Sequence, residues 1–186
     1  MKKGIASYFP IAWSILLAYT LMNLSACQRP FDNTTNALKI DTLENRVAEI
    51  DNTLILDENV FKMRDDSMNQ KLTVIHAKMK VINDGDTAEA VLRYEGIEKN
   101  YQDFLKNYPV MEYDESGYQK SVSEMKQKVL EQKISQTDFN QYFAITKPSL
   151  DDLLKRAKTM TYNTVSIEKD YNRTNPKVTG LFDKLK

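Results

Sequence analysis

The stretch that decides the fold runs from Ile40 to Ile82 and reads IDTLENRVAEIDNTLILDENVFKMRDDSMNQKLTVIHAKMKVI. An apolar residue stands at every seventh position of this stretch, in the series Ile40, Val47, Leu54, Phe61, Met68, Ile75 and Ile82. A period of seven indicates a single apolar stripe along an α-helix. We therefore predict a long first helix over about residues 37–82.

A second apolar series indicates how this helix packs. Early in the stretch a companion residue stands three positions after a member of the first series, as Leu43 and Ile50 do. Late in the stretch it stands four positions on, as Leu72 and Met79 do. This drift is typical of a straight helix in a bundle rather than of an autonomous coiled-coil rod. Because such a helix would extend about 69 Å, we expect a kink or break near residues 57–66.

The rest of the chain predicts further helices. Capping motifs at Asp86, Ser116 and Ser149 mark expected helix starts, and Pro109 and Pro148 mark expected interruptions. We expect a bend over residues 135–139 and loops over residues 112–117 and 172–180. The fold class is all-α, an elongated bundle of antiparallel helices. Apolar side chains at helical spacing define its expected core: Ala90, Tyr94, Ile97, Tyr101, Phe104, Tyr108, Tyr118, Val122, Met125, Val129, Tyr142, Phe143, Ile145, Leu150, Leu153, Leu154, Ala157, Met160, Ile167 and Tyr171.

Composition argues against several classes of function. The 186 residues include 26 basic and 26 acidic residues. The chain as a whole therefore carries no net positive charge that would attract nucleic acid. His76 is the only histidine and Cys27 the only cysteine. His76 lies off the apolar stripe, so we expect it to be solvated. The inventory of nucleophiles, metal ligands and phosphate-binding loops is poor, and we expect neither an enzyme nor a bound metal or cofactor.

The amino-terminal region has the layout of a secretory signal peptide. Lys2 and Lys3 form a short basic start, and no further charge follows until Arg29. Small residues, Ser25 and Ala26, precede the cysteine. A basic start, an apolar run and a small-residue cleavage site are typical of exported proteins.

The sequence Leu24-Ser25-Ala26-Cys27 resembles the lipobox of bacterial lipoproteins. The resemblance implies cleavage between Ala26 and Cys27, a diacylglyceryl group on the Cys27 sulfur and a fatty acid such as palmitate on the new amino terminus. Two or three acyl chains give firm membrane anchoring. No aspartate follows the cysteine. In lipoproteins of Gram-negative bacteria an aspartate there resembles a signal for retention in the inner membrane, so its absence favours the outer membrane, with the protein facing the periplasm or the cell surface. The alternative is an uncut transmembrane anchor, because the apolar run is about 20 residues long.

These features divide the chain into a signal peptide (1–26), a lipidated amino terminus and tether (27–36) and a helical bundle (37–186). We expect a structural, scaffold or partner-binding module, held to the membrane through Cys27, with a protein partner in the envelope or self-association. The alternative is a carrier or sensor that binds a small apolar or peptide ligand. The aromatic stripe of Tyr94, Tyr101, Phe104 and Tyr108 is either part of the core or a recognition face.

Overall fold

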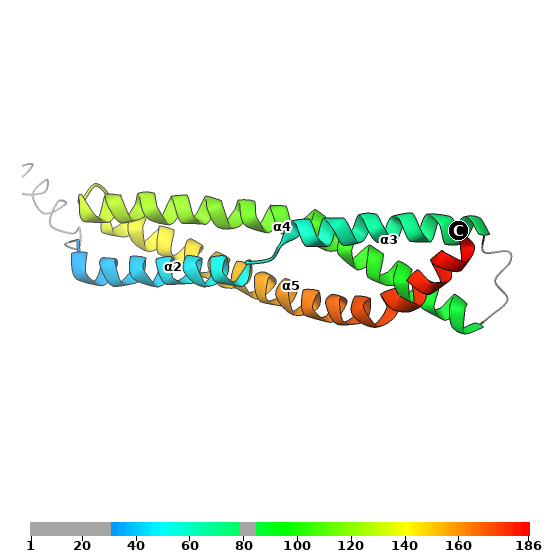
Figure 1. Cartoon of the computed structure of the whole chain (residues 1–186). Coiled ribbons are helices and arrows are strands. Elements are labelled where there is room, and N and C mark those ends of the chain that lie inside the picture. Colours follow the sequence, from blue (N-terminus) through cyan, green and yellow to red (C-terminus); the bar gives the residue numbers. More distant parts are fainter. Residues whose placement is uncertain (1–30, 79–84) are drawn as a thin grey trace, which may run out of the picture.

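The computed structural model describes residues 31–78 and 85–186, and these residues fold into an elongated all-α bundle without strands. The predicted fold class is therefore confirmed. The described helices are α2 (Asn33–Thr53), α3 (Glu58–Lys78), α4 (Gly85–Leu130) and α5 (Gln136–Leu185) (Figure 1).

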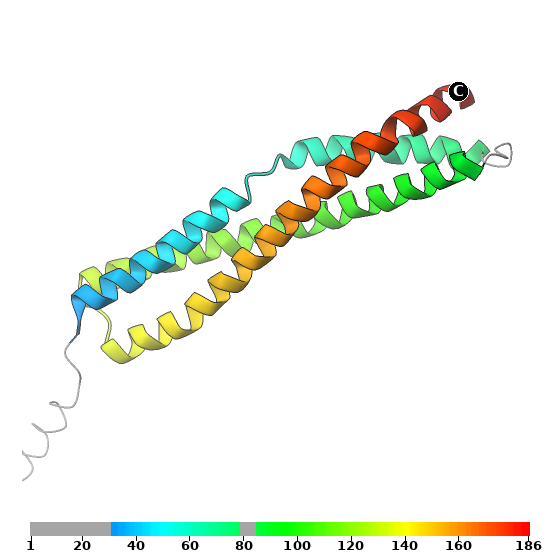
Figure 2. The same ribbon diagram turned by 90° about the horizontal axis from the view of Figure 1, so that it is seen from below.

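Two long antiparallel helices form the frame of the bundle. α5 contains 50 residues and α4 contains 46, so α5 is about 75 Å long. α2 and α3 lie one after the other along this pair; each packs against α4 and α5, and neither packs against the other (Figures 1 and 2). We call the end with the start of α2 and the α4–α5 turn the α2 end. The opposite end, with the carboxy terminus and the start of α4, is the α3 end.

The heptad series of the first stretch supplies one side of the core. Ile40, Val47, Leu54, Phe61, Met68 and Ile75 are all at most 5% exposed, and Ile82 lies outside the described residues. The predicted core positions of α4 and α5 are buried or half-buried against them, except Ile145, which is 61% exposed. The stripe read from the sequence is therefore the stripe that packs, as expected for a helix that buries one face.

The stretch predicted as a long first helix over residues 37–82 is divided into two helices. α2 ends at Thr53, residues 54–57 are not helical, and α3 begins at Glu58. The break thus lies at the amino-terminal edge of the interval 57–66 in which it was expected. Asp57 caps α3, since its Oδ1 atom accepts hydrogen bonds from the backbone N–H groups of Asn59 and Val60 at 3.1 and 3.4 Å.

The predicted tether is shorter than expected, because helix α2 already begins at Asn33. Asp32 caps it by accepting a hydrogen bond from the N–H of Thr35 at 3.0 Å. The fully buried amide of Asn36 pairs with Gln136 of α5. Asn36 donates at 2.9 Å and Gln136 donates back at 3.0 Å. This pair fixes the start of the bundle on α5.

The expected helix ends at Pro109 and Pro148 and the expected loops near Gly117 and Gly180 are also wrong. α4 runs through Pro109 and Gly117, and α5 runs through Pro148, Pro176 and Gly180. All five residues are exposed. A proline inside a helix costs about 3 kcal/mol and a glycine about 1 kcal/mol. The apolar stripes on both sides of each residue remain in phase, and their burial offsets these costs.

The capping assignments have mixed outcomes. Ser116 lies inside α4, and Ser149 lies inside α5, where its hydroxyl donates to the carbonyl oxygen of Ile145 at 3.0 Å. The bend predicted over residues 135–139 lies earlier, because the chain turns over residues 131–135 and residues 136–139 are already helical. Ser135 is the N-cap of α5 and accepts a hydrogen bond from the N–H of Asp138 at 3.1 Å.

Candidate functional site

The α3 half of the rod contains a partly buried polar layer to which α3, α4 and α5 all contribute. The Tyr101 hydroxyl donates a hydrogen bond of 2.5 Å to Glu168 Oε1. Arg64 forms an ion pair with the same carboxylate, and its Nη1 atom lies 3.5 Å from the Tyr101 oxygen. The Arg64 guanidinium also lies over the ring of Tyr171, 5.1 Å from its centroid. A cation, a phenol and a carboxylate thus satisfy one another between α3, α4 and α5.

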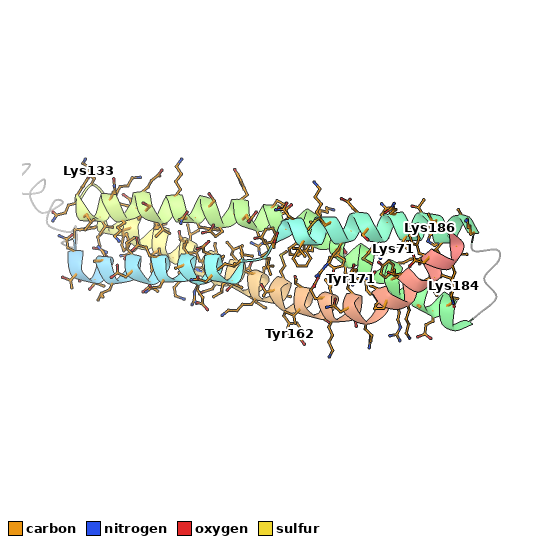
Figure 3. All side chains as sticks on the ribbon, viewed as in Figure 1. Lys71, Lys133, Tyr162, Tyr171, Lys184 and Lys186 are labelled. Atoms are coloured by element: carbon orange, nitrogen blue, oxygen red, sulfur yellow. The ribbon has the colours of Figure 1, made fainter. Side chains whose placement is uncertain are left out.

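A second layer with the same construction lies one heptad nearer the α3 end. Lys71 donates to Asn175 Oδ1 at 2.8 Å and to the Thr179 hydroxyl at 2.9 Å. The Tyr94 hydroxyl donates to the same Asn175 oxygen at 2.7 Å. Figure 3 places the labelled Lys71 and Tyr171 between α3 and α5. As in the first layer, a cation of α3 and a tyrosine of α4 meet one acceptor of α5.

A third layer lies one heptad in the other direction, at the break between α2 and α3. The Tyr108 hydroxyl donates to the carbonyl oxygen of Leu54 at 2.5 Å and approaches that of Leu56 at 3.4 Å. The Thr161 hydroxyl donates to the carbonyl oxygen of Thr53 at 2.9 Å. Side chains of α4 and α5 therefore satisfy carbonyl groups that the end of α2 leaves without helical partners.

The spacing of these residues aligns the three layers. Tyr94, Tyr101 and Tyr108 are seven residues apart on α4, and the α5 residues of the three layers, Asn175, Glu168 and Thr161, are also seven apart. Buried polar groups that match only in one alignment fix the register of packed helices. The sequence predicted the tyrosines but missed their partners. The signal that could have found them is the same spacing of seven, which relates Arg64 to Lys71 and Glu168 to Asn175.

Burial keeps the tyrosine hydroxyls protonated. It raises the pKa of Tyr94 and of Tyr101 above the ordinary value, and raises the pKa of Tyr108 to about 12. Burial also lowers the pKa of Lys71, against a smaller opposing influence of Asp183. The three tyrosines therefore act as hydrogen-bond donors throughout the physiological range.

Two carboxylates, Asp65 of α3 and Glu98 of α4, are partly buried, and Asp65 repels Glu98. Burial raises the pKa of Asp65, the neighbouring Asp66 adds to the effect, and a hydrogen bond to Gln102 opposes it. Burial likewise raises the pKa of Glu98, to which Asp65 and then Glu95 contribute by repulsion. The Asp65 Oδ1 atom is buried without a hydrogen-bond partner among the described residues. This side of α3 is therefore electrostatically unfavourable at neutral pH.

A groove runs between α4 and α5 near the middle of the rod, with a volume of about 730 Å³. Its apolar lining includes Phe104, Met111, Met160 and Ile167. Its polar lining comes from both helices: Asn100, Asp103, Asn107, Asp152, Lys155, Arg156, Thr159, Asn163, Ser166 and Asp170. An apolar stripe with polar edges is suited to an amphipathic helix or an elongated apolar ligand.

The aromatic stripe predicted as either core or recognition face lies in the core. Tyr94 and Tyr101 are fully buried, and Phe104 and Tyr108 are 5% and 4% exposed. The stripe therefore offers almost no accessible surface in this structure. Cys27 and Ala26, the predicted lipidation and cleavage residues, lie outside the described residues.

His76 is exposed, as expected, and its Nε2 atom lies 2.9 Å from Glu95 Oε1. Within residues 31–78 and 85–186, histidine, cysteine and acidic side chains form no group of three or more suited to a metal ion. None of the helices in the same ranges combines the length and hydropathy needed to cross a bilayer.

Comparison with known proteins gave no match to this chain, whether among family models, curated proteins or solved structures.

Proposed function

We propose that the protein is a lipid-anchored component of the bacterial envelope whose helical rod serves as a scaffold or partner-binding module. The observation that carries the proposal is the position of the lipobox cysteine. Cys27 precedes the first residue of α2, Asn33, by six positions. A lipid on this cysteine would therefore hold the α2 end of the rod within roughly 20 Å of the membrane surface.

The geometry of the rod supports a spacer. α5 begins at the α2 end and runs to the α3 end, so an upright rod would reach about 75 Å from the anchored end. The α3 end carries exposed lysines, including Lys78, Lys184 and Lys186, while Lys133 lies in the α4–α5 turn at the α2 end (Figure 3). The sides of the rod and its remote end are then the surfaces available to a protein partner.

A second candidate is a carrier or sensor that binds a small apolar or peptide ligand. The α4–α5 groove is the observation that favours it, since Phe104, Met111, Met160 and Ile167 supply apolar contacts beside polar edges. A ligand seated there would alter the emission of nearby tyrosines. Titration of the purified protein with an amphipathic peptide or a fatty acid, followed by tyrosine fluorescence, tests this candidate.

Labelling of cells with radioactive palmitate tests the anchor. We expect the label on the wild-type protein and its loss from the Cys27→Ser variant, because only a thiol at this position accepts the diacylglyceryl group. Ser25→Ala is a matched control, since it keeps the thiol and leaves a small residue at the same place before the cleavage site. Equal labelling of wild type and Cys27→Ser would contradict the lipid anchor.

Cross-linking in intact cells, followed by purification of the tagged protein, tests the partner-binding role. We expect a defined cross-linked envelope protein, or a cross-linked homodimer, that recurs with cross-linkers attached at different exposed lysines. A protein that yields only the uncross-linked monomer under all conditions would contradict this role.

A further inference from the structure

The break between α2 and α3 is not imposed by its own sequence. The segment Leu54-Ile55-Leu56-Asp57 contains neither proline nor glycine, and those residues are the usual local causes of a break. The apolar heptad series continues in phase across it, from Val47 through Leu54 to Phe61. Local propensity and periodicity therefore both allow a continuous helix through residues 54–57.

Tertiary hydrogen bonds hold the broken form. Tyr108 and Thr161 bond the carbonyl oxygens of Thr53, Leu54 and Leu56. In a continuous helix the same three oxygens would instead accept the N–H groups of the residues four positions later. Each oxygen thus has different partners in the two forms, and in the broken form the Leu54 oxygen also accepts the N–H of Leu56 at 2.7 Å. The broken form also leaves Ile55 75% exposed, which is unfavourable for a large apolar side chain.

Straightening the break would move α3 away from its present site. Figures 1 and 2 show that residues 54–57 carry the chain sideways, so that α3 does not continue the axis of α2. A straight helix would take α3 off the polar layers and uncover Tyr94, Tyr101 and Phe104.

The segment that fits this uncovered face is α3 itself. Arg64 and Lys71 match the acceptors Glu168 and Asn175, and Phe61 packs on Tyr101 and Phe104 with ring centroids 5.6 and 4.4 Å apart. An identical α3 from a second copy would restore every one of these contacts. Exchange of an element between copies through a short connecting segment is a low-cost route to a dimer.

We propose that the α2–α3 break is a switch and that, in its straight form, α3 docks on the tyrosine face of a second copy. This inference rests on the self-association part of the proposed function and names its surface. α3 keeps its direction along the rod when the break straightens, so the two exchanged copies lie parallel. Both α2 ends, and with them both anchors, then lie at the same end of the dimer, as attachment to one membrane requires.

The switch can be biased in both directions by substitution. Tyr108→Phe with Thr161→Val removes the hydrogen bonds that hold the broken form and increases exchange. Glu58→Pro traps the broken form, because proline is compatible with the first position of α3 but not with the interior of a continuous helix. Glu58→Ala is the matched control, since it removes the same carboxylate and permits both forms.

The experiment uses the full-length chain expressed in bacteria in two copies with different affinity tags. After gentle solubilisation, one tag is captured and the other is quantified. We expect heterotypic capture for the wild type, an increase of roughly tenfold for Tyr108→Phe/Thr161→Val, a loss for Glu58→Pro and wild-type capture for Glu58→Ala. Circular dichroism of each purified variant verifies that its helices are formed.

Equal capture by the Glu58→Pro and Glu58→Ala proteins would overturn the proposal, as would absence of capture in both the wild type and Tyr108→Phe/Thr161→Val. If palmitate labels Cys27 and a different protein is cross-linked, but the second tagged copy is not captured, the proposed α3 exchange is contradicted and the proposed function is not. Absence of the palmitate label and of all cross-links would instead contradict the proposed function.

Discussion

The hydroxyl of Tyr101 on α4 donates a hydrogen bond of 2.5 Å to the carboxylate of Glu168 on α5. Because Arg64 of α3 pairs with the same carboxylate, this bond closes a layer that joins three helices. Removal of the phenolic oxygen therefore affects more than one helix pair.

Tyr101→Phe is expected to lower the free energy of unfolding by about 1–3 kcal/mol, because a hydrogen bond from a buried phenol to a charged acceptor is lost while the ring keeps its shape. Urea unfolding followed by circular dichroism measures the difference. Tyr113→Phe removes the same atom from a side chain that is 79% exposed, and we expect almost no change. Equal effects of the two substitutions would show that the layer does not stabilise the bundle.

Asn36→Ala is expected to cost about 1–3 kcal/mol, since it leaves the amide of Gln136 without its buried partner. Gln136→Ala removes the other half of the pair. A double-mutant cycle measures their coupling, and the combined loss should be smaller than the sum of the two single losses. Strict additivity would mean that the two amides act independently.

Asp65→Asn is expected to stabilise the protein at neutral pH. The pKa of Asp65 is raised in the folded protein, so the folded form keeps a proton at a pH at which the unfolded chain has released it. The stabilisation associated with this group is thus present below the unfolded pKa and is lost as pH rises through the folded pKa. Asparagine does not ionise, so the variant does not lose this stabilisation as the pH rises.

Urea unfolding of this variant and of the wild type at several pH values between about 4 and 7.5 tests the expectation. The advantage of Asp65→Asn should be largest at the neutral end and should decrease as the pH falls. Asp103→Asn, at an exposed position of α4, controls for the general effect of removing one negative charge. An advantage that is independent of pH, or equal in the two variants, would contradict the assigned cause.

Gly117→Ala is expected to raise the free energy of unfolding by about 0.5–1 kcal/mol, because alanine favours the helical backbone that Gly117 adopts in the interior of α4. A β-carbon at this position would meet no atom within 4 Å. Gly85→Ala, at the first residue of the same helix, is the matched control and should give a smaller gain. Thermal unfolding measures both. A destabilised Gly117→Ala protein would argue against a continuous α4.

Periodicity located the buried faces but not the ends of the helices. The apolar stripe of α5 continues past Pro148, and that of α4 continues past Pro109, so an interruption was expected where the structure has none. A proline or glycine is a local cost of about 1–3 kcal/mol. Burial of the flanking apolar stripes against other helices offsets this cost. That stabilisation depends on residues far away in the sequence, so it cannot be read from the residues around the proline or glycine.

The candidate site divides in the same way. Tyr94, Tyr101, Phe104 and Tyr108 were identified by their spacing on one helix, although whether they form core or surface depended on what covers them. Their partners, such as Glu168, belong to other helices and are distant in sequence. The spacing of seven groups the polar residues of each helix into a series, but it does not show which series of another helix lies at the same level.

The sequence by itself determined that this chain is helical and which side of each helix is buried, because the period of apolar residues is a local property. Only the tertiary structure decided that the first stretch breaks at residues 54–57, where Tyr108 and Thr161 bond its carbonyl oxygens. Only the tertiary structure aligned the polar layers across three helices. Both outcomes depend on hydrogen bonds between residues far apart in the chain, and their energies exist only once the helices have packed.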